Sequence, residues 1–345
     1  MYSITGRIER IKQPYGGFIK RTDFEIIQLH DDQMLHEEEN ITPSLVGTAV
    51  DYLTRFMMGT PVEQAFEISI KGAHHAKEDE KADELIKSIT GLNKESAIAA
   101  CKLAGYDVCY RIGMSRYKPV SEINPDDGTA ENVIIMVSRS VDFWKEYGPI
   151  VLDGFTFEGG YTPIVSTGDG DFLTKDTLWD FKVLKQEPTS RHTLQLLMYY
   201  IMGKRYNHKE FDSIEYIGLF NPRKNKVYRY PVKDIPEETI STVSHDVIGY
   251  DWKDKEYEAF FKEKLGRALS QSTLKKEISI LPQKNVSVVH KYSEFEIGDR
   301  VFSKKFGEGV VLNVTEHKFC AVADVRFDSG VEKHVVTTYL ERASK

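Results

Sequence analysis

The alternation of side chains in Trp179-Asp180-Phe181-Lys182-Val183 constrains the fold of this 345-residue chain more than any other feature. Successive side chains of a strand point to opposite faces of a sheet. Trp179, Phe181 and Val183 therefore share an apolar face, and Asp180 and Lys182 share the other. A strand that is buried on one side carries an acid beside an ammonium group when these charges meet solvent, each other or a metal ion.

A second acidic segment precedes this strand. The stretch 164–173 reads as a strand that places Asp169 and Asp171 on a common face. A short turn follows it, which predicts a hairpin that brings Asp171 and Asp180 together. Carboxylate oxygens are the ligands that Mg²⁺ and Mn²⁺ prefer, and these ions commonly use one or two acids plus water and substrate phosphate. With Lys182 alongside, the pair of acids indicates metal-dependent hydrolysis of a phosphodiester bond.

A helix is predicted directly after these strands, with Thr189 or Ser190 as its N-cap. Its buried face is indicated by apolar residues at helical spacing, namely Leu194, Leu197, Met198 and Ile201. Gln195 and Tyr199 lie one turn apart on the neighbouring stripe, and His192 lies a turn earlier. The same stripe is also typical of an ordinary amphipathic helix, in which His192 is an exposed residue near the helix start.

In this order, on strand, strand and helix, the segments G-x-x-D-F, W-D-F-K-V and Q-L-x-x-Y resemble the PD-(D/E)XK nuclease superfamily, and within it the RecB-like branch. The resemblance implies an α/β fold with an α-β-β-β-α-β core. It also implies five catalytic residues: Asp171 as the first acid, Asp180 as the second, Lys182 as the lysine, and Gln195 with Tyr199 as the helical pair.

The resemblance further implies that Mg²⁺ or Mn²⁺ binds to Asp171, Asp180 and the main-chain carbonyl of Phe181. The RecB-like pattern has an upstream helix with a His four residues after a Gly, and Asp51 takes that position here. Asp51 is therefore a candidate metal ligand. Its alternative role is an ion pair with Arg55 one turn on, which stabilises a helix by only about 0.3–0.5 kcal/mol.

Two further acids lie near the proposed site in sequence. Asp169 shares the proposed active face, but it also suits a solvated strand end beside two glycines. Glu158 ends the preceding apolar strand, expected at 154–158, and is a third-acid candidate.

A D-x-K triplet alone is common on exposed hairpins, whereas the ordered set of three motifs is more specific. Two functions remain open. The first is a Mg²⁺-dependent deoxyribonuclease, and the second is a catalytically inactive protein of the same fold that binds nucleic acid or acts as a scaffold. The complete acid, acid and lysine set favours the enzyme, because a degenerated site usually loses one of these charges.

The motif is compatible with DNA or RNA as the substrate. It is also compatible with cleavage from an end of the strand or at an internal position.

The formal net charge of −7 means that contacts to polyanionic DNA require local basic patches. One candidate is the hairpin 221–226 with Arg229 beyond it. The other is an amino-terminal stretch with Arg7, Arg10, Lys12, Lys20 and Arg21. Such basic clusters are more often solvated turns than binding sites.

Three scattered cysteines, Cys101, Cys109 and Cys320, are too few for a disulfide framework and indicate a reducing cytoplasm. Some RecB-like nucleases bind an iron–sulfur cluster through four cysteines, so we expect no iron–sulfur cluster here. The sequence shows neither a secretory leader nor a run of about twenty apolar residues, so we expect no membrane association.

The pattern divides the chain into a nuclease domain at 1–269 with a helical insertion at about 62–148, a linker at 270–293, and a small β-barrel at 294–345. The last segment resembles the Tudor-like (SH3-like) module at the carboxyl end of UvrD/PcrA-type helicases, which implies docking to a protein partner or to DNA. Residues 297–345 contain eight Lys or Arg and seven Asp or Glu, too balanced for a strong DNA clamp. A protein partner is therefore favoured, with DNA binding or simple stabilisation as the alternatives.

Overall fold

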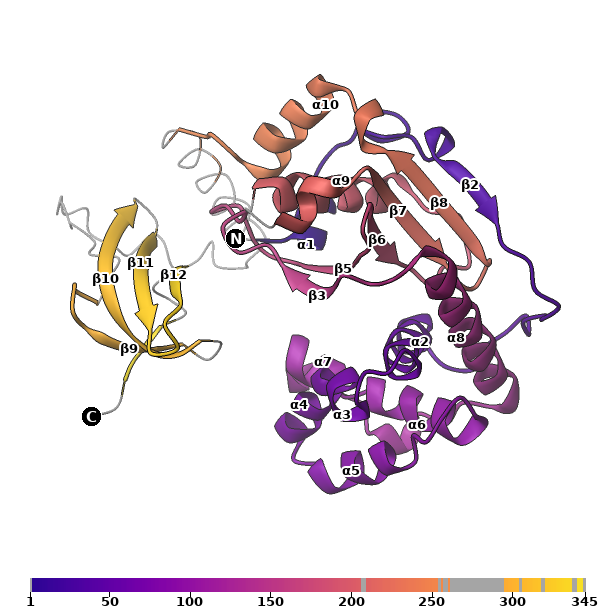
Figure 1. Cartoon of the computed structure of the whole chain (residues 1–345). Helices are drawn as coiled ribbons and strands as arrows, with labels where there is room; N and C mark the ends of the chain where they lie inside the picture. Colours follow the sequence, from indigo (N-terminus) through magenta and orange to yellow (C-terminus); the bar gives the residue numbers. More distant parts are fainter. Residues whose placement is uncertain are drawn as a thin grey trace, which may run out of the picture. The chain divides into compact units, whose positions relative to one another are not determined.

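A computed structural model describes residues 2–205, 209–253, 256, 260, 295–303, 306–317, 320–336 and 340–343. The chain forms two compact units, Met1–Tyr250 and Asp251–Lys345 (Figure 1). The predicted linker at 270–293 lies outside the described residues. In the described part of the chain, no helix combines the length and apolar character that crossing a membrane requires.

The first unit is built on a six-stranded mixed sheet with the spatial order β2-β8-β7-β6-β5-β3. Its strands are β2 (Glu25–Gln28), β3 (Leu152–Thr156), β5 (Asp169–Leu173), β6 (Thr177–Phe181), β7 (Tyr216–Asn221) and β8 (Lys226–Pro231). All neighbours are antiparallel except β6 and β7, which run parallel. A parallel pair needs a crossover, and α9 (Ser190–Arg205) provides it. The unit is therefore of the mixed α/β class, as the sequence predicts.

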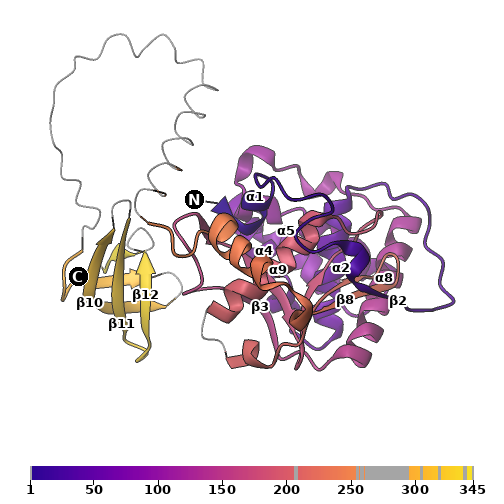
Figure 2. The same cartoon turned by 90° about the horizontal axis from the view of Figure 1, so that it is seen from above.

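Helices cover both faces of this sheet (Figures 1 and 2). On one face, α2 (Pro43–Met57) and α8 (Asp127–Tyr147) contribute to a core that includes Phe172, Trp179 and Phe220. Phe143 of α8 stacks on Phe220 with ring centroids 4.1 Å apart. On the other face, α9 packs against β6 and β7. All five residues of β6 are consequently buried.

Five further helices lie between α2 and α8, inside the segment expected to be a helical insertion. They are α3 (Val62–Ala65), α4 (Glu67–Ala76), α5 (Asp79–Lys87), α6 (Lys94–Ala104) and α7 (Asp107–Arg111). Their ends follow simple capping chemistry: Asn93 accepts a hydrogen bond from Ser96 N at the start of α6, and Asp126 accepts one from Thr129 N at the start of α8. Cys101 and Cys109 are buried free cysteines in α6 and α7.

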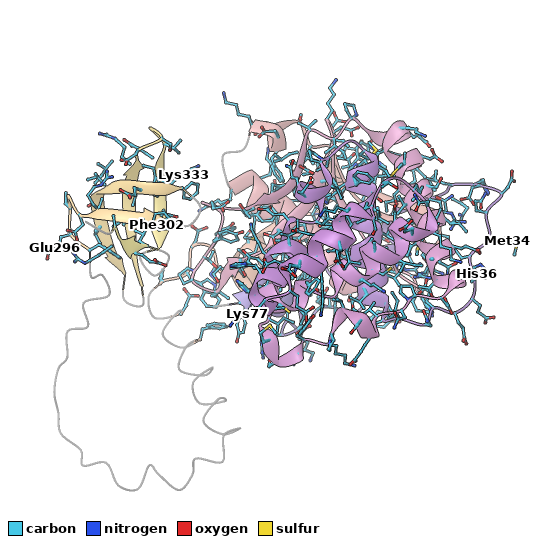
Figure 3. The ribbon with its side chains drawn as sticks, turned by 90° about the horizontal axis from the view of Figure 1, so that it is seen from below. Met34, His36, Lys77, Glu296, Phe302 and Lys333 are labelled. Carbon is cyan, nitrogen blue, oxygen red and sulfur yellow. The ribbon has the colours of Figure 1, made fainter. Side chains whose placement is uncertain are left out.

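The remaining elements of this unit are short. They are β1 (Tyr2–Ser3), α1 (Ile4–Ile8), β4 (Val165–Thr167), α10 (Glu237–Thr242), the π-helix Val243–Ile248 and the 3₁₀ turns Arg21–Asp23, Met114–Arg116, Val120–Glu122, Lys209–Ser213 and Val232–Asp234. Figure 3 shows Met34 and His36 on the connection between β2 and α2.

The expected strand at 164–173 is wrong in one respect, because it breaks at Gly168. Residues 165–167 form β4 and pair with β1 in a separate sheet, whereas β5 pairs with β3 and β6. A β-carbon at Gly168 would lie 2.3 Å from Ile4 Cδ1, so the break depends on close packing of the amino-terminal segment. The expected strand at 154–158 is β3, which starts and ends two residues earlier.

The second unit contains a five-stranded antiparallel sheet with the order β12-β11-β10-β9-β13. Its strands are β9 (Arg300–Ser303), β10 (Gly307–His317), β11 (Cys320–Phe327), β12 (Glu332–Val336) and β13 (Glu341–Arg342). Val301, Val311, Val325 and Phe327 belong to its own apolar core. A turn at 328–330 joins β11 to β12, with Gly330 at φ +84°. Figure 3 labels Glu296, Phe302 and Lys333 on this unit.

Candidate active site

The β5–β6 hairpin brings Asp171, Asp180 and Lys182 together. The ammonium Nζ of Lys182 donates a hydrogen bond to Asp180 Oδ1 at 2.7 Å and lies 3.9 Å from Asp171 Oδ2. The main-chain N–H of Phe181 donates to Asp171 Oδ2 at 2.8 Å. The lysine ammonium thus lies beside both acids, where its positive charge offsets the negative charges of the two carboxylates.

Burial is uneven across this trio. The side chain of Asp180 is 0% exposed, whereas those of Asp171 and Lys182 are 28% and 26% exposed. The sequence predicted an apolar and a charged face for this strand, but α9 covers the charged face and seals Asp180 from water. Access to the site therefore passes by Asp171 and Lys182.

One carboxylate oxygen in the site has unused bonding capacity. Asp180 Oδ2 is buried and has no hydrogen-bond partner among the residues that the structure describes. A buried acceptor without a partner costs roughly 1–3 kcal/mol, and more when it is charged. The fold thus holds a carboxylate oxygen that can bond to a cation, or to Asp171 when one of the two acids carries a proton.

The charges of the trio are coupled. Burial raises the pKa of Asp180 to about 7, a shift that Lys182 opposes and Asp171 reinforces. Burial lowers the pKa of Lys182, but the charges of Asp180 and Asp171 raise it by more, so the net shift is upward. Lys182 therefore stays charged at neutral pH, and Asp180 gains or loses its proton near neutrality when no cation is bound.

Tyr199 of the predicted pair on α9 lies within electrostatic range of the acids. Gln195 Nε2 donates to Tyr199 Oη at 2.6 Å, and both side chains are buried. Burial, followed by the charges of Asp180 and Asp171, raises the pKa of Tyr199 well above its ordinary value. The phenol accordingly remains neutral beside the carboxylates. The ring of Tyr199 stacks on Phe157 with centroids 5.2 Å apart, which limits its movement.

His192 is half-buried, so the expectation of an exposed residue is wrong. Its Nδ1 accepts a hydrogen bond from the main-chain N–H of Thr189 at 2.9 Å. Burial, followed by the charges of Lys182 and Arg191, lowers the pKa of His192 to about 4. His192 is thus a neutral imidazole within the electrostatic range of Lys182.

Asp51 forms the ion pair that was one of its two predicted roles. Arg55 Nε lies 3.0 Å from Asp51 Oδ1, which is the helical ion pair. Burial raises the pKa of Asp51, Arg55 opposes the shift, and the charge of Asp171 adds to it. The carboxylate therefore lies within the electrostatic range of the trio while it is held by Arg55, and its role as a metal ligand remains a prediction.

The two weaker candidates lie at strand ends. Asp169 is exposed at the first position of β5. Glu158 follows β3 and accepts a hydrogen bond from the hydroxyl of Thr156.

The structure adds residues that the sequence did not single out. Arg55 Nη1 lies 3.1 Å from Asp153 Oδ2 of β3, and the Arg55 guanidinium lies 4.6 Å from the centroid of the Phe172 ring. A hollow lined by Arg55, Asp153, Phe172 and Trp144 lies here, and neither Asp171 nor Asp180 lines it. No sequence signal indicated this contact, because Arg55 and Asp153 are 98 residues apart.

Two predicted DNA-contacting cations have other partners. Arg7 is 7% exposed and donates to the main-chain oxygens of Val247 and Asp246 at 2.8 and 2.7 Å. Its predicted place in a surface patch is therefore wrong. Arg229 lies 3.3 Å from Asp176 and 3.9 Å from the ring centroid of Tyr216. Arg21, in contrast, joins Lys224 and Lys226 in one cluster.

The donor set fits a hard divalent cation that keeps several waters. The described residues contain no group of three or more His, Cys, Asp or Glu side chains placed to hold a metal ion. Mg²⁺ is usually bound through one or two carboxylates with water and phosphate, so Asp171 and Asp180 supply as many acids as such an ion needs. The unpartnered Asp180 Oδ2 is the observation that supports this fit.

No protein family, curated protein or solved structure matches this chain.

Proposed function

We propose that this chain is a Mg²⁺-dependent nuclease that hydrolyses DNA phosphodiester bonds. The observation that carries the proposal is the buried Asp180, whose Oδ1 is bonded to Lys182 while Oδ2 has no partner among the described residues. Asp171 lies at the solvent side of the same ammonium group. Such a set suits a cation and a phosphate, and it has little value as a purely structural ion pair.

The topology of the first unit supports the PD-(D/E)XK assignment. A helix precedes the antiparallel run β3-β5-β6, α9 crosses over, and β7 pairs parallel with β6. This is the α-β-β-β-α-β order that the sequence resemblance implies. The proposed acids lie on the inner strands β5 and β6, where neighbouring strands on both sides hold the backbone in place.

The residues of the chain divide the chemistry among them. Asp171, Asp180 and the carbonyl of Phe181 would hold Mg²⁺ or Mn²⁺, which would supply an activated water and neutralise charge on the phosphoryl oxygens. Lys182 stays charged, so its ammonium orients the attacking oxygen and stabilises negative charge as it develops. Gln195 and the neutral Tyr199 support the acids from α9 and exclude bulk water.

A cleavage panel tests this proposal. Purified full-length protein is incubated with linear, circular and single-stranded DNA in Mg²⁺, Mn²⁺ or EDTA, beside Lys182→Ala and Asp180→Ala. We expect cleavage in Mg²⁺ or Mn²⁺ that EDTA and both substitutions abolish. Lys175→Ala is a matched control, because Lys175 is an exposed lysine between the same two strands. Cleavage that survives both active-site substitutions would refute the site, and failure to cut any DNA or RNA would favour an inactive binder.

For the second unit we propose a Tudor-like (SH3-like) docking module. Its five-stranded antiparallel sheet with a separate apolar core supports a small autonomous β-fold. Arg300 at its surface lies 2.7 Å from both Asp328 and Glu308, so this cation is already neutralised. That pairing favours a protein partner over DNA.

A further inference from the structure

Two basic stretches that are distant in sequence meet at Glu187, on the loop between β6 and α9. Arg21 Nη1 lies 3.3 Å from Glu187 Oε2, and Lys226 and Lys224 Nζ lie 3.1 and 3.6 Å from Oε1. The hydroxyl of Tyr228 donates to Oε2 at 2.6 Å. We name Arg21, Lys224 and Lys226, held by Glu187, the Glu187 cluster.

The Glu187 cluster has excess positive charge. Three cations surround one carboxylate, which leaves a net charge of about +2 in the cluster. The hydrogen bond from Tyr228, followed by that from Lys226, lowers the pKa of Glu187, so the carboxylate stays ionised. The nearby Glu39 does not cancel the excess, since it pairs with Arg223 at 2.7 Å.

The three cations reach solvent. The side chains of Arg21, Lys224 and Lys226 are 36%, 30% and 27% exposed. Glu187 holds them in converging positions, which lowers the entropy that would be lost when they bind an anion. Lys20 and Lys185, which neighbour the cluster in sequence, are exposed and add to the positive field.

The cluster is fixed relative to the proposed catalytic lysine. The main-chain N–H of Lys182 donates to Phe220 O at 3.0 Å. Asn221 then clamps the main chain of Leu184, accepting from its N–H at 3.2 Å and donating to its carbonyl at 2.9 Å. Glu187 is five residues beyond Lys182, a span of at most roughly 18 Å. A nucleic-acid strand advances about 3.4 Å per nucleotide in B-form, so the cluster lies within roughly five nucleotides of the scissile bond.

We propose that the Glu187 cluster binds the phosphodiester backbone of the nucleic acid on one side of the cleaved bond. The inference rests on the proposed nuclease function, and it adds where the flanking strand lies. On α2 and β3, Asp51 and Asp153 are both paired with Arg55. The substrate is therefore a polymer that extends several nucleotides beyond the cut, toward the β7–β8 hairpin.

Equilibrium binding tests the cluster separately from catalysis. Full-length wild type and Lys224→Ala/Lys226→Ala are titrated in EDTA against a labelled 20-nucleotide single strand and the matching duplex, by fluorescence anisotropy at several salt concentrations. We expect the double variant to bind about tenfold more weakly and to lose about 1.4–1.8 from the slope of log K against log salt, since two phosphate contacts disappear. Lys71→Ala, which removes an exposed cation paired with Glu67 on α4, is the matched control and should bind as wild type.

Catalysis separates this proposal from the function on which it rests. The double variant should raise KM for the 20-nucleotide substrate about tenfold and leave kcat unchanged. Hydrolysis of bis(p-nitrophenyl) phosphate, which is too short to reach the cluster, should not change. Lys224→Arg/Lys226→Arg should restore binding, which excludes misfolding as the cause. Absent cleavage with intact cluster-dependent binding would refute only the enzyme.

Two results would overturn the cluster proposal. The first is an unchanged affinity and salt slope in the double variant. The second is displacement of the 20-nucleotide strand by polyglutamate as readily as by unlabelled DNA of equal charge, which would indicate an acidic protein partner.

Discussion

Two buried aspartates in the first unit have opposite surroundings. Asp107 on α7 accepts hydrogen bonds from Tyr52 Oη and Ser69 Oγ, each at 2.6 Å, so both of its oxygens are bonded. Asp180 on β6 has one bonded oxygen and one without a partner among the described residues. Burial raises the pKa of both, so a pKa shift alone does not separate them.

The difference separates an acid whose oxygens are both bonded within the fold from one that we propose binds a cation. Tyr52 and Ser69 satisfy Asp107 from α2 and α4, and Arg111 lies 3.6 Å away, so the network joins the helical insertion to α2. Asp180 faces a second acid and retains bonding capacity, an arrangement that is unfavourable until a cation binds. Substitutions of the two acids should therefore have different consequences.

The largest effect is expected for catalysis. Lys182→Ala and Asp180→Asn should each lower the rate of DNA cleavage by about 10³-fold, because each removes charge stabilisation at the reacting phosphate. Asp107→Asn should leave the rate within about twofold of wild type, since Asp107 belongs to the structural network. The cleavage rates of all three variants are measured at saturating Mg²⁺ on the same labelled duplex. An equal loss of activity in Asp107→Asn and Asp180→Asn would remove the distinction.

Stability should show the reverse order. Asp107→Ala leaves the Tyr52 and Ser69 hydroxyls without their buried acceptor and should cost about 3 kcal/mol in the free energy of unfolding. For a unit of this size that lowers Tm by roughly 6–12 °C. Asp180→Asn in EDTA should not lower Tm, because the neutral amide removes the cost of burying an ionised carboxylate whose pKa is raised to about 7. Thermal unfolding of both variants at pH 8 makes the comparison, and a larger loss for Asp180→Asn would contradict it.

The dependence on pH should separate Asp180 from ordinary carboxylates. Its pKa is raised to about 7 in the folded state, against about 3.9 in the unfolded chain, so the folded state binds more protons between these values. In EDTA its contribution to stability is therefore complete below about pH 4 and is lost as the pH rises through about 7. The Tm of wild type minus the Tm of Asp180→Asn, measured across pH 4–8, isolates this contribution and should fall as the pH rises.

Mg²⁺ should compete with that proton. Because the ion favours the ionised carboxylate, the acidic limb of the cleavage profile should move to lower pH by up to about one unit per tenfold increase in Mg²⁺. A limb that does not move with Mg²⁺ would place the titrating group outside the site.

Asp51 should give the smallest effect. If its carboxylate contributes to the cation, Asp51→Asn raises the Mg²⁺ concentration for half-maximal cleavage about tenfold, with kcat nearly unchanged. If it serves only Arg55, the Mg²⁺ dependence is unaltered. Arg55→Lys is the control, because it keeps the charge that faces Asp51 while it alters the contact to Asp153.

Local sequence was sufficient for the β5–β6 hairpin and for α9. The alternation from Trp179 to Lys182 follows from the way successive side chains of a strand point to opposite faces. This rule acts over only a few residues. The Gln195–Tyr199 pair follows from helical spacing in the same way. These short-range rules explain why the amino-acid sequence alone is enough to select Asp171, Asp180 and Lys182.

The sequence by itself determined the hairpin that carries Asp171 and Asp180, the helix that follows it, and which of its side chains share a face. Only the tertiary structure decided that α9 buries Asp180, that Gly168 interrupts a strand, that Arg7 is internal, and that Arg21 meets Glu187 across 166 residues. The physical reason is range. Periodicity reports on neighbours within a turn or a pleat, whereas burial and the meeting of distant charges depend on how whole elements pack, which no local pattern encodes.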